Sequence, residues 1–416
     1  MSIHPPIPRT AAESALLAAY DSRVADLPGD AGVSNARDAA IEAFKANGLP
    51  TRRVESWHYT DLKSLLRTIP EGGETGGTLA PLIDGSAILE IVDGAARPAP
   101  EMPGIIATRI EAKLTDGSFA RALGIRGPDD TIGMLNAAFV SDGYHLAIAG
   151  DVTKPVEIQV RAGTASHSRL AVRVDAGANA TIIERQCGGD GFVSAVSHLT
   201  VGDDARVVWV IDQERGAKAL QLGQFNAVLG RNSGLTLFIM NAGGALVRQE
   251  VHVAAEGEGA SFTLRGVNLI GGDSHVDNTM TLAHLAENTA SSAVFRNVVT
   301  ARGHGVFQGQ IRVAREAQKT DAKMACNTLL LSDDAEFSAK PELEIFADDV
   351  ACGHGATVTE IDAAHLFYLK ARGIAEPEAR GLLIKAFLAA IIEELEDEAL
   401  VEALETRLAD WLETNR

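Results

Sequence analysis

A cysteine and a histidine near the C-terminus are the residues of this chain best suited to bind a metal. Cys352 and His354 lie in the segment KPELEIFADDVACGHG, residues 340–355. The alternation of apolar and polar residues in this segment is typical of a β-strand, in which residues two apart point to the same side. Thiolate and imidazole are both ligands for soft or borderline metals. The spacing therefore predicts two side chains that face one way and could share a metal ion.

Two ligands do not complete a structural metal site, which for zinc takes four. The alternative is a buried cysteine and a hydrogen-bonded histidine at a strand end, and spacing alone favours this alternative. Gly353 and Gly355 flank the histidine, so that backbone or a second chain could approach closely. The pattern leaves both hypotheses open.

The composition indicates a soluble globular protein and excludes several functions. The chain has 416 residues, of which 46% are hydrophobic, enough for two or three packed units. It carries 37 Lys and Arg against 56 Asp and Glu, and the resulting net charge of −19 repels nucleic acid and anionic membranes. Aromatic residues make up only 5%, which argues against platforms that stack on bases or sugars. Three widely spaced cysteines, without an apolar leader or a membrane-spanning run, favour a cytoplasmic location.

Helical patterns precede the main part of the chain. Residues 10–13 have the spacing of a capping box, so a first helix is expected to follow, and a second is expected over residues 35–47. The cluster Trp57-His58-Tyr59 predicts large rings that anchor these helices to the main domain. Residues 70–78, PEGGETGGT, have the composition of a flexible linker.

A regular repeat of short strands and turns begins near residue 152. Turns recur at Gly177, Asp203, Asn232 and Gly257, between strands such as RVVWVI and LTLFI. Two or three short strands per repeat of this length are typical of a β-solenoid, whose coils bury their inner faces by stacking. An antiparallel β-sandwich would show similar spacing. The pattern alone does not decide between them.

The period becomes helical after residue 358. Asp362 is a suitable N-cap for a helix that ends at Gly373, and Pro377 has the position of a first-turn proline in the next helix. A third apolar stripe runs from Leu400 to Leu412 within an acidic segment, which is best explained as a solvated helix face.

Three segments together resemble the SufD family, a subunit of the SUF iron–sulfur cluster assembly scaffold. They are KPELEIFADDVACGHGATV followed by LFYLKARGI, then GVFQGQIRVAREAQKTDAKM at residues 305–324, and VESWHYTDLKSL at residues 54–65. The resemblance implies a mainly β protein, a right-handed parallel β-helix flanked by N-terminal and C-terminal helices. It implies a non-enzymatic scaffold subunit that pairs with a SufB-like paralogue and a SufC-like ABC ATPase, and that aids iron acquisition.

The resemblance also assigns functions to particular residues. His354, with Cys352, would hold iron or an iron–sulfur cluster transiently, sharing it with the SufB-like partner. Cys326 departs from the family pattern, so it is either an additional metal or sulfur site or a small buried residue. The ATPase is expected to contact the first C-terminal helix, at Leu366, Tyr368, Leu369, Arg372 and Gly373. An isolated chain is expected to form a homodimer through the same solenoid edge.

No Gly-Lys dipeptide occurs in the chain, so a Walker A motif is absent and this chain should bind no nucleotide. The expected domains are residues 1–70, helical, residues 71–358, the β-helix, and residues 359–416, which dock the ATPase. Two other functions remain as alternatives. One is a β-helix enzyme that processes polysaccharides, and the other is a stand-alone metalloprotein with Cys and His ligands. Neither nucleic acid nor a membrane is expected as a partner.

Overall fold

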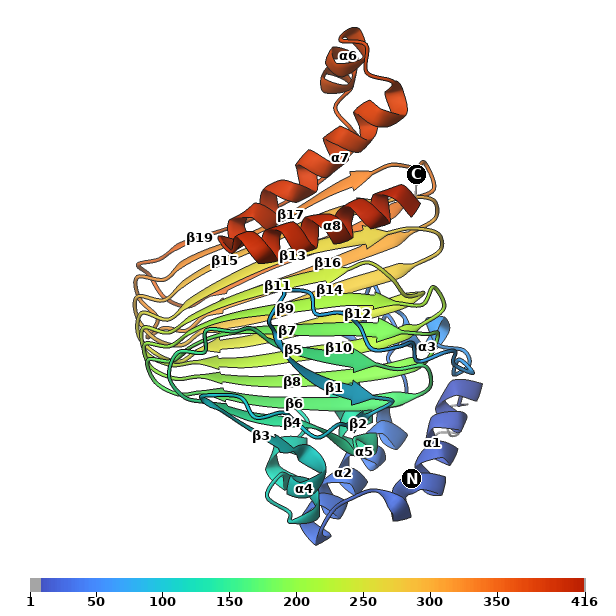
Figure 1. Cartoon of the computed structure of the whole chain (residues 1–416), viewed down its shortest axis with the longest axis vertical. Helices are drawn as coiled ribbons and strands as arrows, with labels where there is room; N and C mark the ends of the chain where they lie inside the picture. Colours follow the sequence, from blue (N-terminus) through green and yellow to red (C-terminus); the bar gives the residue numbers. More distant parts are fainter. Residues whose placement is uncertain (1–8, 415–416) are drawn as a thin grey trace, which may run out of the picture.

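The computed structural model describes residues 9–414, which form a two-sided β-solenoid with helices packed on its outside (Figure 1). The longer helices are α1 Ala11–Arg23, α2 Ala31–Asn47, α5 Thr131–Phe139, α6 Ala363–Ala371, α7 Glu376–Ile392 and α8 Glu398–Thr414. The shorter ones are η1 Val24–Asp26, η2 Glu55–Trp57, α3 Leu62–Leu65, α4 Ile110–Thr115, η3 Ala120–Leu123 and η4 Glu393–Leu395.

Strands from alternate positions in the chain form the two sheets. The first sheet, called sheet A, contains β1 Ala87–Val92, β2 Ala95–Ala96, β5 Val156–Arg161, β7 Asn179–Gly188, β9 Arg206–Arg215, β11 Gly234–Asn241, β13 Ser261–Ile270, β15 Ala290–Val299, β17 Asp321–Leu330 and β19 Ala351–Thr359. The second, sheet B, contains β3 Ile105–Arg109, β4 Asp142–Ile148, β6 Ser166–Val174, β8 Phe192–Val201, β10 Leu220–Leu229, β12 Leu246–Ala255, β14 His275–His284, β16 His304–Val313 and β18 Glu336–Ile345.

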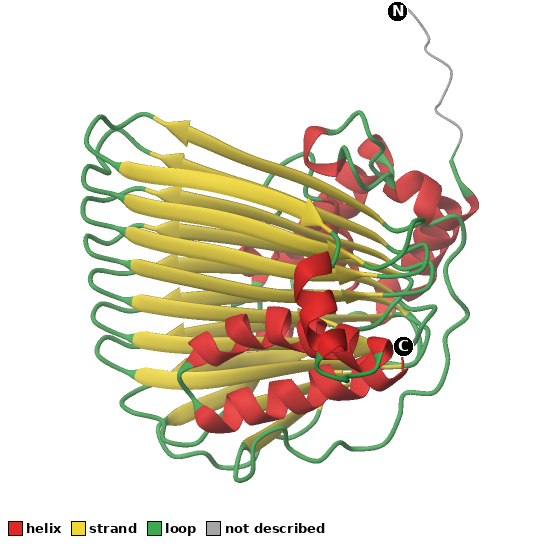
Figure 2. Ribbon diagram, turned by 90° about the horizontal axis from the view of Figure 1, so that it is seen from above, coloured by secondary structure: helices red, strands yellow, loops and turns green. Residues whose placement is uncertain are grey.

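Each coil contributes one strand to each sheet, and the strands from β4 onward pair in parallel with the strand two positions away. Leu220 of β10 pairs with Leu246 of β12, and His275 of β14 pairs with His304 of β16. This parallel pairing confirms the β-solenoid and excludes the antiparallel sandwich. Figure 2 shows the strands stacked above one another, with a row of turns aligned along one edge.

The strand sequences place one apolar row after another inside the solenoid. Trp209, Phe225 and Leu237 belong to one continuous interior cluster and are fully buried. Turns stack closely as well, since a Cβ at Gly257 would lie 2.1 Å from the Arg231 backbone nitrogen. Only glycine fits this position, which is why small residues recur at the turns.

The helices cover the outer faces of the two sheets. Tyr20, Phe44 and Phe139 pack with Phe192 and neighbouring residues on the outside of sheet B. On the other side α7 and α8 cover the outside of sheet A, as Figure 2 shows. The sequence therefore predicted the fold class correctly, a mainly β solenoid with helices before and after it.

Local expectations for the helices and the linker have different outcomes. The capping box is confirmed, because Thr10 and Glu13 each accept a hydrogen bond from the other's backbone. The second helix begins earlier than expected, at Ala31, because Asp30 caps it through the Val33 N–H. The linker prediction is wrong. Residues 70–78 lie against the solenoid, where Gly73 N–H donates to the Gly163 carbonyl and Arg161 donates to the Gly76 carbonyl at 2.8 Å.

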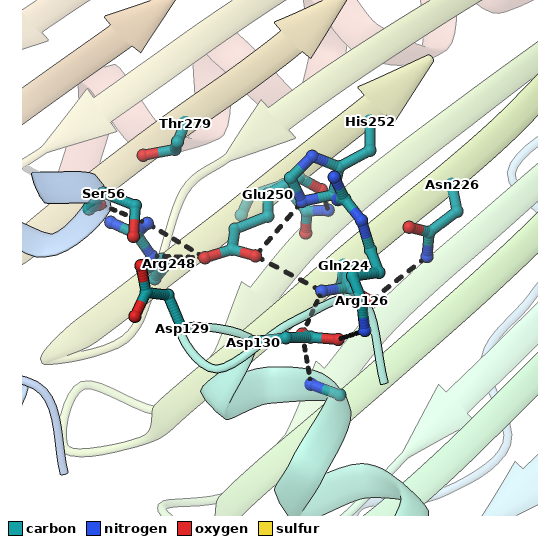
Figure 3. A network of polar contacts seen from close by, with 12 residues as sticks. Ser56, Arg126, Asp129, Asp130, Gln224, Asn226, Arg248, Glu250, His252 and Thr279 are labelled. Atoms are coloured by element: carbon teal, nitrogen blue, oxygen red, sulfur yellow. Dashed lines mark hydrogen bonds and ion pairs between the residues drawn. The ribbon is translucent and has the colours of Figure 1, made fainter. Parts of the chain in front are cut away.

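Trp57 anchors the N-terminal region to sheet B, as expected. Its ring is fully buried, and the Arg248 guanidinium carbon lies 3.8 Å from the ring centroid. Arg248 donates to the Ser56 carbonyl at 2.7 Å and to Glu250 at 2.9 Å, and it also pairs with Asp277. Figure 3 shows how this buried network continues through Gln224 to Asp130, the N-cap of α5.

No helix within residues 9–414 is long and apolar enough to cross a membrane.

Candidate metal-binding site at the open end of the solenoid

The last coil of the solenoid has one face without a neighbour. β18 pairs with β16 and β19 pairs with β17, and each stands at the end of its sheet. Most residues of β19 are exposed, and Ile345, Phe346 and Val358 leave 40%, 49% and 44% of their surface accessible. Unpaired edges of this kind are templates for another chain. We call this surface, formed by β18, β19 and the turn between them, the open end.

Cys352 and His354 continue the interior rows of the solenoid into the open end. They pair in register with Ala322 and Met324 of β17, which are both buried in the interior. Cys352 is half-buried and packs against the interior cluster, whereas His354 is exposed. The two side chains therefore stand on one face, because alternate residues of a strand point the same way. This face is exposed only because the next coil is missing.

Burial raises the pKa of the Cys352 thiol above its ordinary value. The carboxylate of Asp321 adds to the rise, while a backbone hydrogen bond from Ala322 opposes it. The thiol is therefore protonated at neutral pH, and it becomes a thiolate ligand only when a cation replaces the proton. Within residues 9–414, no group of three or more His, Cys, Asp or Glu side chains is arranged to hold a metal ion.

Cys326 lies inside the solenoid, one coil below the open end. It is fully buried, and burial raises its pKa to about 12. Its sulfur accepts a hydrogen bond from Asn297 Nδ2 at 3.3 Å. In register it pairs with Ala356, so it is a diagonal neighbour of His354, with Cα atoms roughly 8 Å apart, and lies farther from Cys352. The structure brings Cys352 and His354 together on the inward-facing side of β19, and it places Cys326 one coil below Ala356, diagonal to His354.

The helix expected to bind the ATPase projects from the body beside the open end. No residue of α6 is buried, and Tyr368 leaves 56% of its surface exposed. Leu366 and Leu369 are half-buried, Arg372 stacks on the Tyr368 ring, and Gly373 ends the helix with a φ of +88°. Phe367, which is 73% exposed, was not among the residues expected to contact the ATPase. Figure 1 shows α6 standing clear of the strands.

Comparisons with known proteins decide the family. A family model described as the SufBD core domain of SUF system FeS cluster assembly matches residues 157–387, more than half of the chain. A second model, the SufBD protein N-terminal region, matches residues 16–68. The chain belongs to the SufBD family.

Individual SufBD relatives are similar along most of the chain. The iron–sulfur cluster assembly protein SufD of Escherichia coli strain K12 is 29% identical over 401 residues, covering 89% of this chain and 91% of the relative. An iron–sulfur cluster assembly SufBD family protein of Mycobacterium tuberculosis is 24% identical over 391 residues, covering 90% of this chain and 91% of the relative. A SufBD family protein of Synechocystis is 29% identical over 204 residues, covering 49% of this chain and 45% of the relative.

These matches support a role in iron–sulfur cluster assembly within the SUF system, as the resemblance implied. They favour that role over a polysaccharide-processing β-helix enzyme.

Proposed function

We propose that this chain is a non-enzymatic scaffold subunit that assembles nascent iron–sulfur clusters in the cytoplasm with a SufB-like paralogue and a SufC-like ABC ATPase. Family membership supports the process, and the open end supports the partnership. A stacked-coil protein with an uncovered last coil exposes unpaired backbone and apolar side chains. A second solenoid of similar cross-section would cover both. The uncovered coil is the observation that carries the proposal.

The pair of possible ligands at this end is incomplete in a way that a partner could correct. Cys352 and His354 offer one sulfur and one nitrogen on the same face, whereas a closed tetrahedral site takes four ligands. Since no third ligand from residues 9–414 completes a metal group, the remaining ligands would come from the facing subunit. Iron or a cluster is then cargo shared between two chains, and the stand-alone metalloprotein is the weaker alternative.

The protonated Cys352 thiol gives this site a pH dependence. Binding of iron must displace the thiol proton, so affinity should rise with pH. His354 is exposed, so it can bind iron before the two subunits close around the site. In this way the chain would aid iron acquisition. Cys326 is enclosed in the interior, so in this proposal it packs the core and binds no metal.

A single exposed imidazole provides the test. His354→Ala should abolish maturation of iron–sulfur enzymes in cells that depend on this system, and should leave less iron bound to the complex after co-purification with the partner. Thr359→Ala is the matched control, because Thr359 is exposed at the end of the same strand but lies on its opposite, outer face. Full maturation by His354→Ala would refute the metal assignment.

The exposed surface of α6 supports ATPase docking. α6 has no buried residue and carries two adjacent exposed aromatic rings, Phe367 and Tyr368, an apolar surface of the kind that a partner protein covers. Glutamate at both positions should abolish co-purification with the ATPase without changing the unfolding midpoint. Deleting the whole region after residue 362 is a poorer test, because Leu400 and Leu404 of α8 are part of the packing on sheet A. Retained co-purification by the double variant would show that the ATPase binds elsewhere.

A further inference from the structure

The interior of the solenoid contains a row of buried amides along sheet A. It runs through five consecutive strands, from Gln186 through Gln213, Asn241 and Asn268 to Asn297. Each of these side chains exposes 2% or less of its surface. Buried amides are costly unless their donors and acceptors are paired, so the partners of each one matter.

The half of the row nearer the open end is paired directly. Asn241 donates to Asn268 at 2.8 Å, and Asn268 donates to Asn297 at 2.6 Å. Asn297 in turn donates to Thr328 at 2.9 Å and to the sulfur of Cys326. The donors all point toward the open end, so this half forms one directed ladder.

The other half of the row is paired as well. Gln186 donates to the Glu184 carboxylate at 2.5 Å and accepts a hydrogen bond from Gln221. The second oxygen of Glu184 accepts a hydrogen bond from Ser197 at 3.1 Å. Burial raises the pKa of Glu184, and its hydrogen bonds oppose that rise.

The two halves meet at Gln213, where direct pairing stops. Gln213 is fully buried, yet neither Nε2 nor Oε1 of its amide has a hydrogen-bond partner among the described residues. The backbone next to it carries no side chain at Gly244, where an added Cβ would lie 3.6 Å from Gln213 Nε2. Gly244 also has a φ of +93°, so another residue there would be strained.

We infer that Gln213 binds a buried water molecule that joins the two halves of the interior row. A donor and an acceptor on one amide are the chemistry that a water molecule satisfies, and buried waters make about three hydrogen bonds to such groups. An amide has four hydrogen-bonding positions, so the neighbouring amides of Gln186 and Asn241 can supply the third contact.

The direct test is a high-resolution crystal structure of the full chain. It should show an ordered water within hydrogen-bonding distance of both amide atoms of Gln213. Water relaxation dispersion in solution should show about one fewer long-lived internal water in Gln213→Met than in the unaltered chain. An empty site in the density, or an unchanged dispersion amplitude, would overturn the inference.

Unfolding midpoints distinguish a hydrated amide from a dry one. If water pairs the amide, Gln213→Met should leave the urea midpoint unchanged or lower it, because it removes satisfied hydrogen bonds. A raised midpoint would mean that the amide is unpaired, and would overturn the inference. Asn268→Leu is the matched control. It removes a directly paired amide of the same row, so its midpoint should fall.

Discussion

Replacing Arg248 by methionine should detach the N-terminal region from the solenoid. Arg248 is fully buried, and its guanidinium joins two carboxylates of sheet B, Glu250 and Asp277, to the Ser56 carbonyl and the Trp57 ring of the N-terminal region. Methionine fills much of the same volume but carries no charge. Glu250 and Asp277 then remain buried without their cation.

The expected loss of unfolding free energy is about 3–5 kcal/mol, the usual cost of removing one partner from a buried ion pair. A solvent-exposed ion pair serves as the comparison for this loss of unfolding free energy. Arg302 and Asp273 leave 68% and 73% of their side chains exposed, so Arg302→Met should cost less than about 1 kcal/mol. Adding Glu250→Gln to the Arg248 variant should recover part of the loss, since one of the two uncompensated charges disappears.

The loss should also depend on pH. Burial already raises the pKa of Glu250, and Arg248 opposes that rise, so removing Arg248 raises the pKa further. The folded variant then binds a proton more readily than the unfolded chain does. The contribution of Glu250 to the stability of the variant is therefore greatest at low pH and decreases as pH rises through the folded-state pKa of this group. The difference between the variant and the unaltered protein should be larger at pH 8 than at pH 5.5.

Urea unfolding at the two pH values measures these differences, and hydrogen exchange of residues 11–65 shows whether the N-terminal helices open first. A midpoint for Arg248→Met no lower than that of Arg302→Met would refute the argument, as would a loss that does not change with pH.

Three further predictions concern the interior and the open end. His284 is fully buried between Thr289 and Ser291, and burial lowers its pKa to about 4. The stability of the protein should therefore fall as pH drops from about 6.5 to about 4. His284→Gln should reduce the number of protons that the protein takes up on acid unfolding by about one. Alkylation at neutral pH, followed by mass spectrometry, should label Cys352 slowly and leave Cys326 unlabelled until the protein unfolds. Burial raises the pKa of both thiols, and Cys326 is also enclosed in the interior. Rapid labelling of Cys326 would contradict its interior position. Val358→Lys places a charge on the open end, so it should lower the fraction of dimer that the isolated chain shows in sedimentation. Ile106→Lys, at a distant exposed position, should not change that fraction. Equal dimer fractions for the two variants would exclude this edge as the dimer contact.

The repeat of strands and turns could be recognised in the sequence, although the family resemblance was needed to choose the solenoid over an antiparallel sandwich. Turns recur at nearly constant intervals, and glycine or asparagine stands where the backbone bends, as Asn232 does with a φ of 50°. The amide row was missed although it has the same period. Asn241, Asn268 and Asn297 lie 27 and 29 residues apart, so aligning the repeats by their turns would have revealed it.

Contacts between distant parts of the chain could not be predicted from the sequence. Arg248 and Ser56 are 192 residues apart, and nothing in either segment indicates the other. The strand sequences indicate in part that a helix covers the outside of sheet A. Strands such as β9 and β11 are apolar on both faces, where Val210 and Phe238 point outward under the helices. A strand buried on both sides loses its alternation, and that loss indicates a covering helix.

The candidate site was predictable in part, because the alternation of residues along a strand is a local pattern. Alternation placed Cys352 and His354 on one face, and the structure shows that face as an interior row. Whether a row is enclosed depends on the presence of a next coil, which a local pattern does not show. Cys326 has a similar local pattern but lies beneath a complete coil.

If the proposed ATPase binds α6, the connection between α6 and the open end indicates how the ATPase could act on the candidate metal site. β19 ends at Thr359 and α6 begins at Ala363, whereas α8 is fixed to the body of sheet A by the ion pair of Arg407 with Asp212. A pull on α6 would therefore act first on the pairing of β19 with β17. Asn327 and Thr357 pair across these strands, and Thr357 Oγ1 donates to Asn327 Oδ1 at 2.9 Å. Cysteines at both positions are close enough for a disulfide, since paired strands lie about 4.8 Å apart. In the proposed mechanism, the oxidised variant should still bind the ATPase but fail to load iron, and reduction should restore loading; normal loading while oxidised would show that these strands need not separate.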